Sequence, residues 1–126
     1  MSENREHESL AFRKKPLKER IALRERVSAA HPETVPVIVS SPDATLSLQK
    51  WRYLVPTTHR MAMLYYEIQR HSLGIASQDS IFYLVSDAYH KSVSVPGTQT
   101  VGQVYEQRKD IDGFLYILVM RESTFG

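Results

Sequence analysis

Five histidines, two nearby aspartates and a C-terminal glycine are the residues of this 126-residue chain that could take part in chemistry. Histidines hold a metal ion when they lie at ligand spacing, as in a His-x-x-x-His pair on one helix. No such pair occurs here, because the five are scattered along the chain: His7, His31, His59, His71 and His90. We therefore predict no metal site and expect each histidine at the surface or at a helix end.

The motifs of common enzyme classes are also missing from the sequence. The five glycines form neither a G-x-G-x-x-G loop nor a Walker motif, and no G-x-S-x-G nucleophile motif occurs. The absence of cysteine excludes a disulfide, a cysteine zinc site and a mechanism that uses the chain's own thiolate. Asp110 and Asp112 stand in a turn, where aspartate commonly forms local hydrogen bonds. The sequence therefore predicts no catalytic residue, no cofactor and no enzyme.

Gly126 permits a different chemistry, in which the chain itself is the group that is transferred. Activation of a protein's own C-terminal carboxylate needs a terminal residue that enters a narrow catalytic cleft, and glycine has no Cβ to clash there. The carboxylate would be the electrophile, and the attacking thiols would belong to other proteins. A terminal glycine is a weak signal alone and gains weight only behind a ubiquitin-like domain.

Hydrophobic periodicity predicts a first helix that starts at Pro16, where proline is tolerated, and ends at His31-Pro32. Its apolar arc consists of Leu17, Ile21, Leu23 and Val27. A second helix should be capped by Thr57 or Thr58 and stop before Gly74, and a third covers 101–109.

Four strands are predicted around these helices, at 35–39, 51–55, 81–85 and 114–120. Pro36 should confine the start of the first strand to a sheet edge or a bulge, and the continuous apolar run 81–85 should be buried on both faces. Residues 86–100 are expected to form a long loop. The order predicts an α+β fold, a ubiquitin-like β-grasp with a four-stranded mixed sheet and an additional N-terminal helical layer.

Positive charge gathers in residues 13–26, although the formal net charge of the chain is only +2. This segment contains two glutamates and seven basic residues: Arg13, Lys14, Lys15, Lys18, Arg20, Arg24 and Arg26. Such a run is either a solvated helix face or a docking surface for an acidic partner. No apolar run approaches the roughly 20 residues of a membrane span, and residues 1–6 do not resemble a secretory signal, so we expect a cytoplasmic protein.

Four short segments resemble the autophagy-related ubiquitin-like modifiers, the autophagy-related protein eight family that includes the GABARAP and light-chain-three proteins. They occur in the family's order: VPVIV at 35–39, YLVP at 53–56, DGFLY at 112–116 and TFG at 124–126. The resemblance runs from Phe12 to Gly126. It divides the chain into a flexible tail at 1–11, a ubiquitin-like domain with its N-terminal helices at 12–122, and a flexible conjugation tail at 123–126.

The resemblance implies that Gly126 is the attachment residue. An E1-like enzyme would activate it, an E2-like enzyme would carry it as a thioester, and an amide bond would join it to phosphatidylethanolamine. A cysteine protease would expose the glycine and later remove the lipid. The protein would be cytoplasmic and, when lipidated, bound to the autophagosome membrane, with no nucleic-acid partner.

The family also binds receptor and adaptor peptides that carry an aromatic residue and, three positions later, an aliphatic one. Such a peptide adds a strand to the sheet. By resemblance, the aromatic pocket is lined by Leu23, Val27, Pro36, Arg52, Leu54 and Phe114. The aliphatic pocket is lined by Tyr53, Val55, Pro56 and Leu64. Lys50 and Arg52 would attract acidic residues that precede the motif, chiefly by faster association.

Three residues depart from the family's pattern around the aliphatic pocket. The family usually has aliphatic residues where His59 and Glu67 stand, and an arginine where His71 stands. Trp51 also replaces a usual lysine. These changes should weaken or retune peptide binding but leave lipid conjugation untouched. The alternative function is an unconjugated module that docks on peptides or membranes through its basic N-terminal helix.

Overall fold

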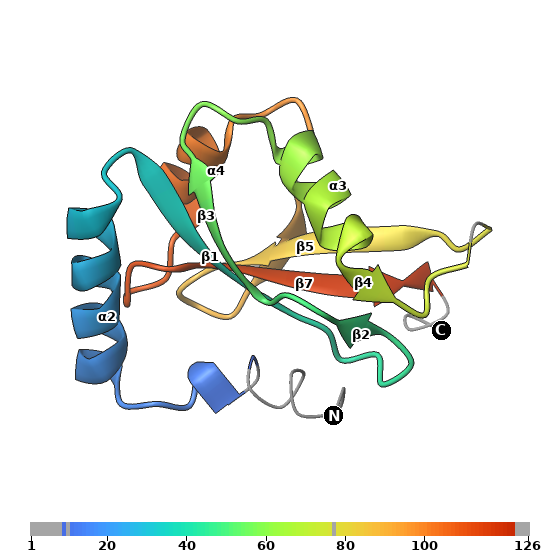
Figure 1. Cartoon of the computed structure of the whole chain (residues 1–126), viewed down its shortest axis with the longest axis horizontal. Helices are drawn as coiled ribbons and strands as arrows, with labels where there is room; N and C mark the ends of the chain where they lie inside the picture. Colours follow the sequence, from blue (N-terminus) through green and yellow to red (C-terminus); the bar gives the residue numbers. More distant parts are fainter. Residues whose placement is uncertain (1–8, 10, 77, 123–126) are drawn as a thin grey trace.

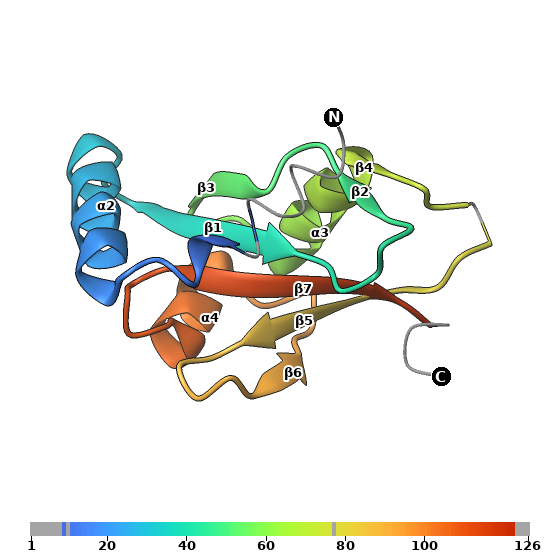
Figure 2. The ribbon, with the colours of Figure 1, turned by 90° about the horizontal axis from the view of Figure 1, so that it is seen from below.

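The computed structural model describes residues 9, 11–76 and 78–122, and its centre is one five-stranded mixed sheet. The strand order is β3-β1-β7-β5-β6, with β1 and β7 parallel and the other neighbours antiparallel. These strands are β1 (Thr34–Ser40), β3 (Arg52–Pro56), β5 (Ile81–Ser86), β6 (Ser92–Ser94) and β7 (Leu115–Arg121). Figure 2 shows β1, β7 and β5 crossing the middle of the molecule. The predicted α+β, ubiquitin-like class is confirmed.

The helices α2 (Leu17–Ala30), α3 (Met61–Arg70) and α4 (Val101–Arg108) pack around the sheet. In Figure 1, α2 stands at one end of the sheet, well apart from α3. The main core joins α3 and α4 to one sheet face through side chains such as Val37, Ile68 and Val104. A smaller aromatic cluster lies on the opposite face: Phe12, Ile38, Trp51, Phe114 and Tyr116. Leu23 of α2 packs against it.

The predicted count of four strands is wrong, because the segment expected to be a loop at 86–100 contains β6. Val93 of β6 pairs with Val85, and its side chain packs against the main core. The alternation of serine and valine at 92–95 fits a strand whose valines face the core. Two further short strands, β2 (Ser47–Leu48) and β4 (Ser72–Leu73), pair with each other in a separate sheet.

The start predicted for the second helix is also wrong. This helix, α3, begins at Met61, and its N-cap residue Arg60 makes no side-chain capping bond. Main-chain carbonyls from the loop before α4 replace the predicted threonine cap, because Met61 N–H donates to Gln99 O at 2.8 Å and Ala62 N–H to Gly97 O at 3.0 Å. The first-turn N–H groups are therefore bonded by tertiary contacts instead of by a local side chain.

One strand expectation is met and another needs correction. β1 is a central strand, but its start at 34–36 pairs only with β3, because the pairing with β7 begins at Val37, so the missing N–H of Pro36 breaks no ladder bond. β5 is not buried on both faces, because Phe82 is 40% exposed. Val119 faces the main core, so its strand neighbour Met120 faces the other way. Phe82 pairs with Met120 and therefore lies on the face of the sheet opposite α3 and α4.

Candidate functional site

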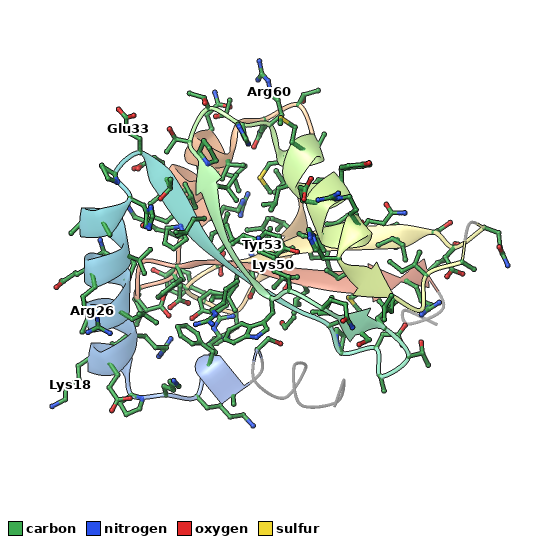
Figure 3. The ribbon with its side chains drawn as sticks, in the orientation of Figure 1. Lys18, Arg26, Glu33, Lys50, Tyr53 and Arg60 are labelled. Carbon is green, nitrogen blue, oxygen red and sulfur yellow. The ribbon has the colours of Figure 1, made fainter. Side chains whose placement is uncertain are left out.

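Two pockets lie on either side of strand β3. The α2 pocket, between α2 and the sheet, has a volume of about 430 Å³ and is lined by Phe12, Leu23, Val27, Pro36, Val37, Ile38, Lys50, Arg52, Tyr53, Leu54 and Phe114. The α3 pocket has a volume of about 630 Å³ and is lined by Lys50, Tyr53, Leu54, Val55, Pro56, His59, Ala62, Met63, Leu64, Tyr66 and Glu67. Lys50, Tyr53 and Leu54 line both pockets, and Figure 3 places Lys50 and Tyr53 between α2 and α3.

The residues expected for the aromatic pocket all line the α2 pocket, and those expected for the aliphatic pocket all line the α3 pocket. Buried and exposed side chains of β3 both contribute to this lining. Along β3, Tyr53 and Val55 are buried, whereas Arg52, Leu54 and Pro56 are exposed. Of the three departures from the family pattern, His59 and Glu67 line the α3 pocket and His71 does not.

The floor of the α2 pocket contains an aromatic residue that sequence reasoning missed. Phe12 is buried, with its ring centroid 5.0 Å from that of Phe114 in an edge-on arrangement and 6.0 Å from that of Trp51. Val37 and Ile38 were also missed in this pocket, as were Ala62, Met63 and Tyr66 in the α3 pocket. Ala62, Met63 and Tyr66 lie on the same helix as Leu64, so the predicted helix could have indicated them. Nothing local in the sequence pairs Phe12 with Phe114.

Buried carboxylates hold α2 and the segment before it against the sheet. Asp112 is fully buried, and its Oδ2 accepts hydrogen bonds from Arg20 Nη1 at 2.7 Å and from the Tyr116 hydroxyl. Asp110 is also buried, and its Oδ1 lies 2.7 Å from Arg13 Nη2. These bonds position the helix face that carries Leu23 and Val27, so the α2 pocket depends on them.

The same ion pairs correct two expectations, one about the aspartates of the turn and one about the basic segment at 13–26. Asp110 and Asp112 do form local turn bonds, but they also bind arginines more than 90 residues earlier in the chain. Arg13 and Arg20 therefore do not contribute to a free basic surface. Of the remaining basic residues of this segment, Lys14, Lys15, Lys18 and Arg26 are exposed. Figure 3 shows Lys18 and Arg26 pointing outward from α2.

The outer edge of β3 offers main-chain groups for pairing with another strand. Val39 N–H donates to Trp51 O at 2.8 Å, so these two residues form a hydrogen-bonded pair between β1 and β3. Hydrogen-bonded and non-hydrogen-bonded pairs alternate in an antiparallel ladder. Arg52 and Leu54 therefore occupy non-hydrogen-bonded positions in the β1 pairing. Their N–H and C=O groups point away from β1, toward the open edge between the pockets.

Positive charge borders the α2 pocket. Lys50 Nζ lies 4.5 Å from the centroid of the Tyr53 ring, and the Arg52 guanidinium carbon lies 4.9 Å from the Trp51 ring. Cation–π contacts of this kind hold the two cations close to the strand. The rim of this pocket thus favours the binding of a ligand with an acidic group.

Burial raises the pKa of Tyr53 from its ordinary value of 10.0 to about 12, with smaller contributions from Glu67 and Tyr83. The unfolded chain therefore loses this proton at a lower pH than the native protein does. The stabilising contribution of the buried, protonated Tyr53 phenol is complete below pH 10. We therefore expect the free energy of unfolding to fall between about pH 10 and pH 12. Urea unfolding at a series of pH values tests this. Tyr53→Phe should flatten the alkaline decrease, and an unchanged slope in that variant would contradict the assignment.

The part of the chain that the structure describes contains no group of three or more His, Asp or Glu that could hold a metal ion. Among the same residues, no helix is both long and apolar enough to cross a membrane. The predicted attachment residue Gly126, the proposed tail at 123–126 and most of the tail at 1–11 lie outside the described residues.

Comparisons with known proteins show which proteins this chain is similar to. Residues 19–126 match the protein family described as "Autophagy protein Atg8 ubiquitin like". The chain is 33% identical over 118 residues to autophagy-related protein 8 of Dictyostelium discoideum, with 88% of each chain covered. It is 33% identical over 113 residues to autophagy-related protein 8b of Arabidopsis thaliana, again with 88% of each covered. The fold is similar to the crystal structure of ATG8 from Trypanosoma brucei, with a TM-score of 0.72 and 21% identity over 88% of this chain and 92% of that one.

Proposed function

The chain belongs to the Atg8 family of ubiquitin-like autophagy proteins, and from this premise we propose that it is a non-enzymatic modifier that links membranes to peptide-bearing partners. In this proposal, Gly126 is joined to phosphatidylethanolamine on autophagosomal membranes. The groove along β3 binds motifs with an aromatic residue and, three positions later, a second anchor residue. The observation that carries the proposal is an open strand edge lying between two apolar pockets.

The peptide binds by strand addition. Leu54 and Arg52 donate and accept main-chain hydrogen bonds along the open edge of β3, which fixes the register of the peptide. Peptide side chains three positions apart can then reach the two pockets on either side of the strand. The aromatic ring enters the α2 pocket, against Leu23 and Phe114, and the second anchor enters the α3 pocket, against Val55 and Leu64. Lys50 and Arg52 attract acidic residues of the partner and speed association.

Conjugation is proposed from the family match, which extends to residue 126. An E1-like enzyme uses ATP to activate the Gly126 carboxylate as an acyl adenylate, with release of pyrophosphate, and a thiol of the E2-like enzyme later holds the same carbonyl as a thioester. The amine of phosphatidylethanolamine then attacks the thioester carbonyl, so that an amide bond forms and the enzyme's thiol leaves. A cysteine protease exposes the glycine and later cleaves the amide. The conjugated protein would leave the cytoplasm for the autophagosome membrane.

Truncation of Leu54 tests the groove. Leu54 lines both pockets and is 41% exposed, so Leu54→Ala removes contact area without opening the core. We expect the variant to lose about 1–3 kcal/mol of binding free energy for an aromatic-x-x-aliphatic peptide, measured by calorimetry. Phe114→Ala should cost a similar amount, but Phe114 is a buried core residue, so Leu54 gives the cleaner test.

Leu73→Ala is the matched control, because Leu73 is an exposed leucine on β4 that lines neither pocket. It should bind the peptide as the wild type does. Equal affinity of all three proteins, with unchanged urea unfolding, would remove the groove from the proposed function.

A further inference from the structure

The α3 pocket contains one acidic side chain among largely apolar walls. Glu67 lines the pocket from α3, opposite the side chains that β3 contributes, and its side chain is 43% exposed. The walls include Tyr53, Val55 and Leu64, all of them buried residues of the main core. A ligand side chain in this pocket therefore meets hydrocarbon over most of its length and a carboxylate at one side.

The present partners of Glu67 hold it only weakly. Its Oε2 lies 3.4 Å from Arg70 Nη2 and 3.8 Å from His71 Nδ1, and both contacts are with neighbours on the same helix or at its end. Exposed ion pairs of this kind contribute little to stability, so a better-placed cation can replace them. A purely aliphatic ligand would instead cover part of the carboxylate without pairing with it, and partial desolvation of a charge is unfavourable.

The two ends of the groove differ in formal charge, because Lys50 and Arg52 line the α2 pocket whereas Lys50 and Glu67 line the α3 pocket. Arg52 lines only the α2 pocket, and Glu67 lines only the α3 pocket. Lys50 borders both, and its ammonium group is held over the ring of Tyr53. His59 also lines the α3 pocket. A peptide that is acidic near its aromatic residue and basic at its second anchor matches this arrangement.

We propose that the α3 pocket selects lysine or arginine as the second anchor, three positions after the aromatic residue, in preference to an aliphatic side chain. This inference rests on the proposed peptide-binding function. The long hydrocarbon stem packs along Tyr53, Val55 and Leu64, and the charged end pairs with Glu67 at the rim. Glu67 is then a specificity-determining residue, and the partner class is an acidic-aromatic-x-x-basic peptide.

The test uses three peptides that differ only at the second anchor, which is leucine, lysine or N-acetyl-lysine. The acetylated residue keeps the stem of lysine but lacks its charge. Affinities are measured by fluorescence anisotropy for the full-length wild type, for Glu67→Gln and for Glu106→Gln. Glu106 is an exposed residue of α4 that lines neither pocket, so its variant is a control for the loss of one negative charge.

We expect the wild type to bind the lysine peptide about fivefold more tightly than either neutral peptide, as suits a partly exposed ion pair. The preference should disappear in Glu67→Gln, persist in Glu106→Gln and shrink with added salt. Equal or tighter binding of the neutral peptides to the wild type would overturn the proposal, and so would a lysine preference that survives in Glu67→Gln.

A fourth peptide, with alanine in place of the aromatic residue, separates this inference from the proposed function. If the first three peptides bind, depend on the aromatic residue and show no lysine preference, only the selectivity of the α3 pocket fails. If no peptide binds, or if the aromatic residue makes no difference, the groove function fails and the selectivity fails with it.

Discussion

We expect Gly126→Ala to abolish formation of the phosphatidylethanolamine conjugate. In the proposed mechanism the reacting carbon is the terminal carbonyl, and a methyl group on the adjacent Cα would stand inside the narrow clefts of the enzymes that handle the tail. The measurement is reconstitution with the E1-like and E2-like enzymes, ATP and phosphatidylethanolamine liposomes. Mass spectrometry should detect the lipid adduct on the wild type and none on the variant.

Two controls sharpen this result. Ser123→Ala changes another residue of the same tail and should be conjugated normally, because position 123 takes no part in bond formation. Leu54→Ala should also be conjugated normally, because the groove and the reacting carbonyl are separate in the proposed function. The conjugation hypothesis fails if the wild type and Gly126→Ala are equally unmodified while a related family member is lipidated in the same reaction.

Local sequence patterns were sufficient to predict most of the fold. β-Branched and aromatic runs marked β1, β3, β5 and β7, and the capping pattern of Thr100 and Gln103 now accounts for the start of α4. The pocket residues could be predicted through the family resemblance, and most of them stand within helices or strands, while Phe114 directly precedes β7. Strand alternation then separated buried Tyr53 from exposed Leu54.

The errors arose where tertiary contacts replace local signals. The start of α3 depends on carbonyl groups of Gly97 and Gln99, more than 30 residues later in the chain, so no local cap marks it. The short β6 gains its strand conformation from pairing with β5. The roles of Arg13 and Arg20 required knowledge of which acids they meet, and those acids are far away in sequence. A charge run alone cannot distinguish a solvated face from a buried ion pair.

The buried carboxylate of Asp112 should be the polar group whose loss costs this fold most. Its Oδ1 accepts the N–H of Phe114 at 2.8 Å, while Oδ2 binds Arg20 and the Tyr116 hydroxyl. Asp112→Ala would leave three donors without this acceptor, one of them a largely buried cation. Removal of one member of a buried ion pair typically costs about 3–5 kcal/mol. We expect a loss of that size in the free energy of unfolding, measured by urea denaturation.

The matched comparison is an ion pair at the surface. Lys109 Nζ lies 3.8 Å from Glu106 Oε2, with both side chains exposed, so Lys109→Ala should cost less than about 1 kcal/mol. Asp112→Asn should fall between the two, because the amide oxygen can still accept the Phe114 N–H but carries no charge for Arg20. A cost below about 1 kcal/mol for Asp112→Ala would show that the buried pair contributes no more than an exposed one.

Loss of Asp112 should also affect the two pockets differently. Arg20 ties α2 to the turn before β7, and α2 supplies Leu23 and Val27 to the α2 pocket only. Under conditions where Asp112→Ala remains folded, binding of the aromatic anchor should weaken, while the preference at the second anchor stays as in the wild type. A variant that weakens both anchors equally would instead indicate general unfolding, and one that weakens neither would show that α2 keeps its position without this ion pair.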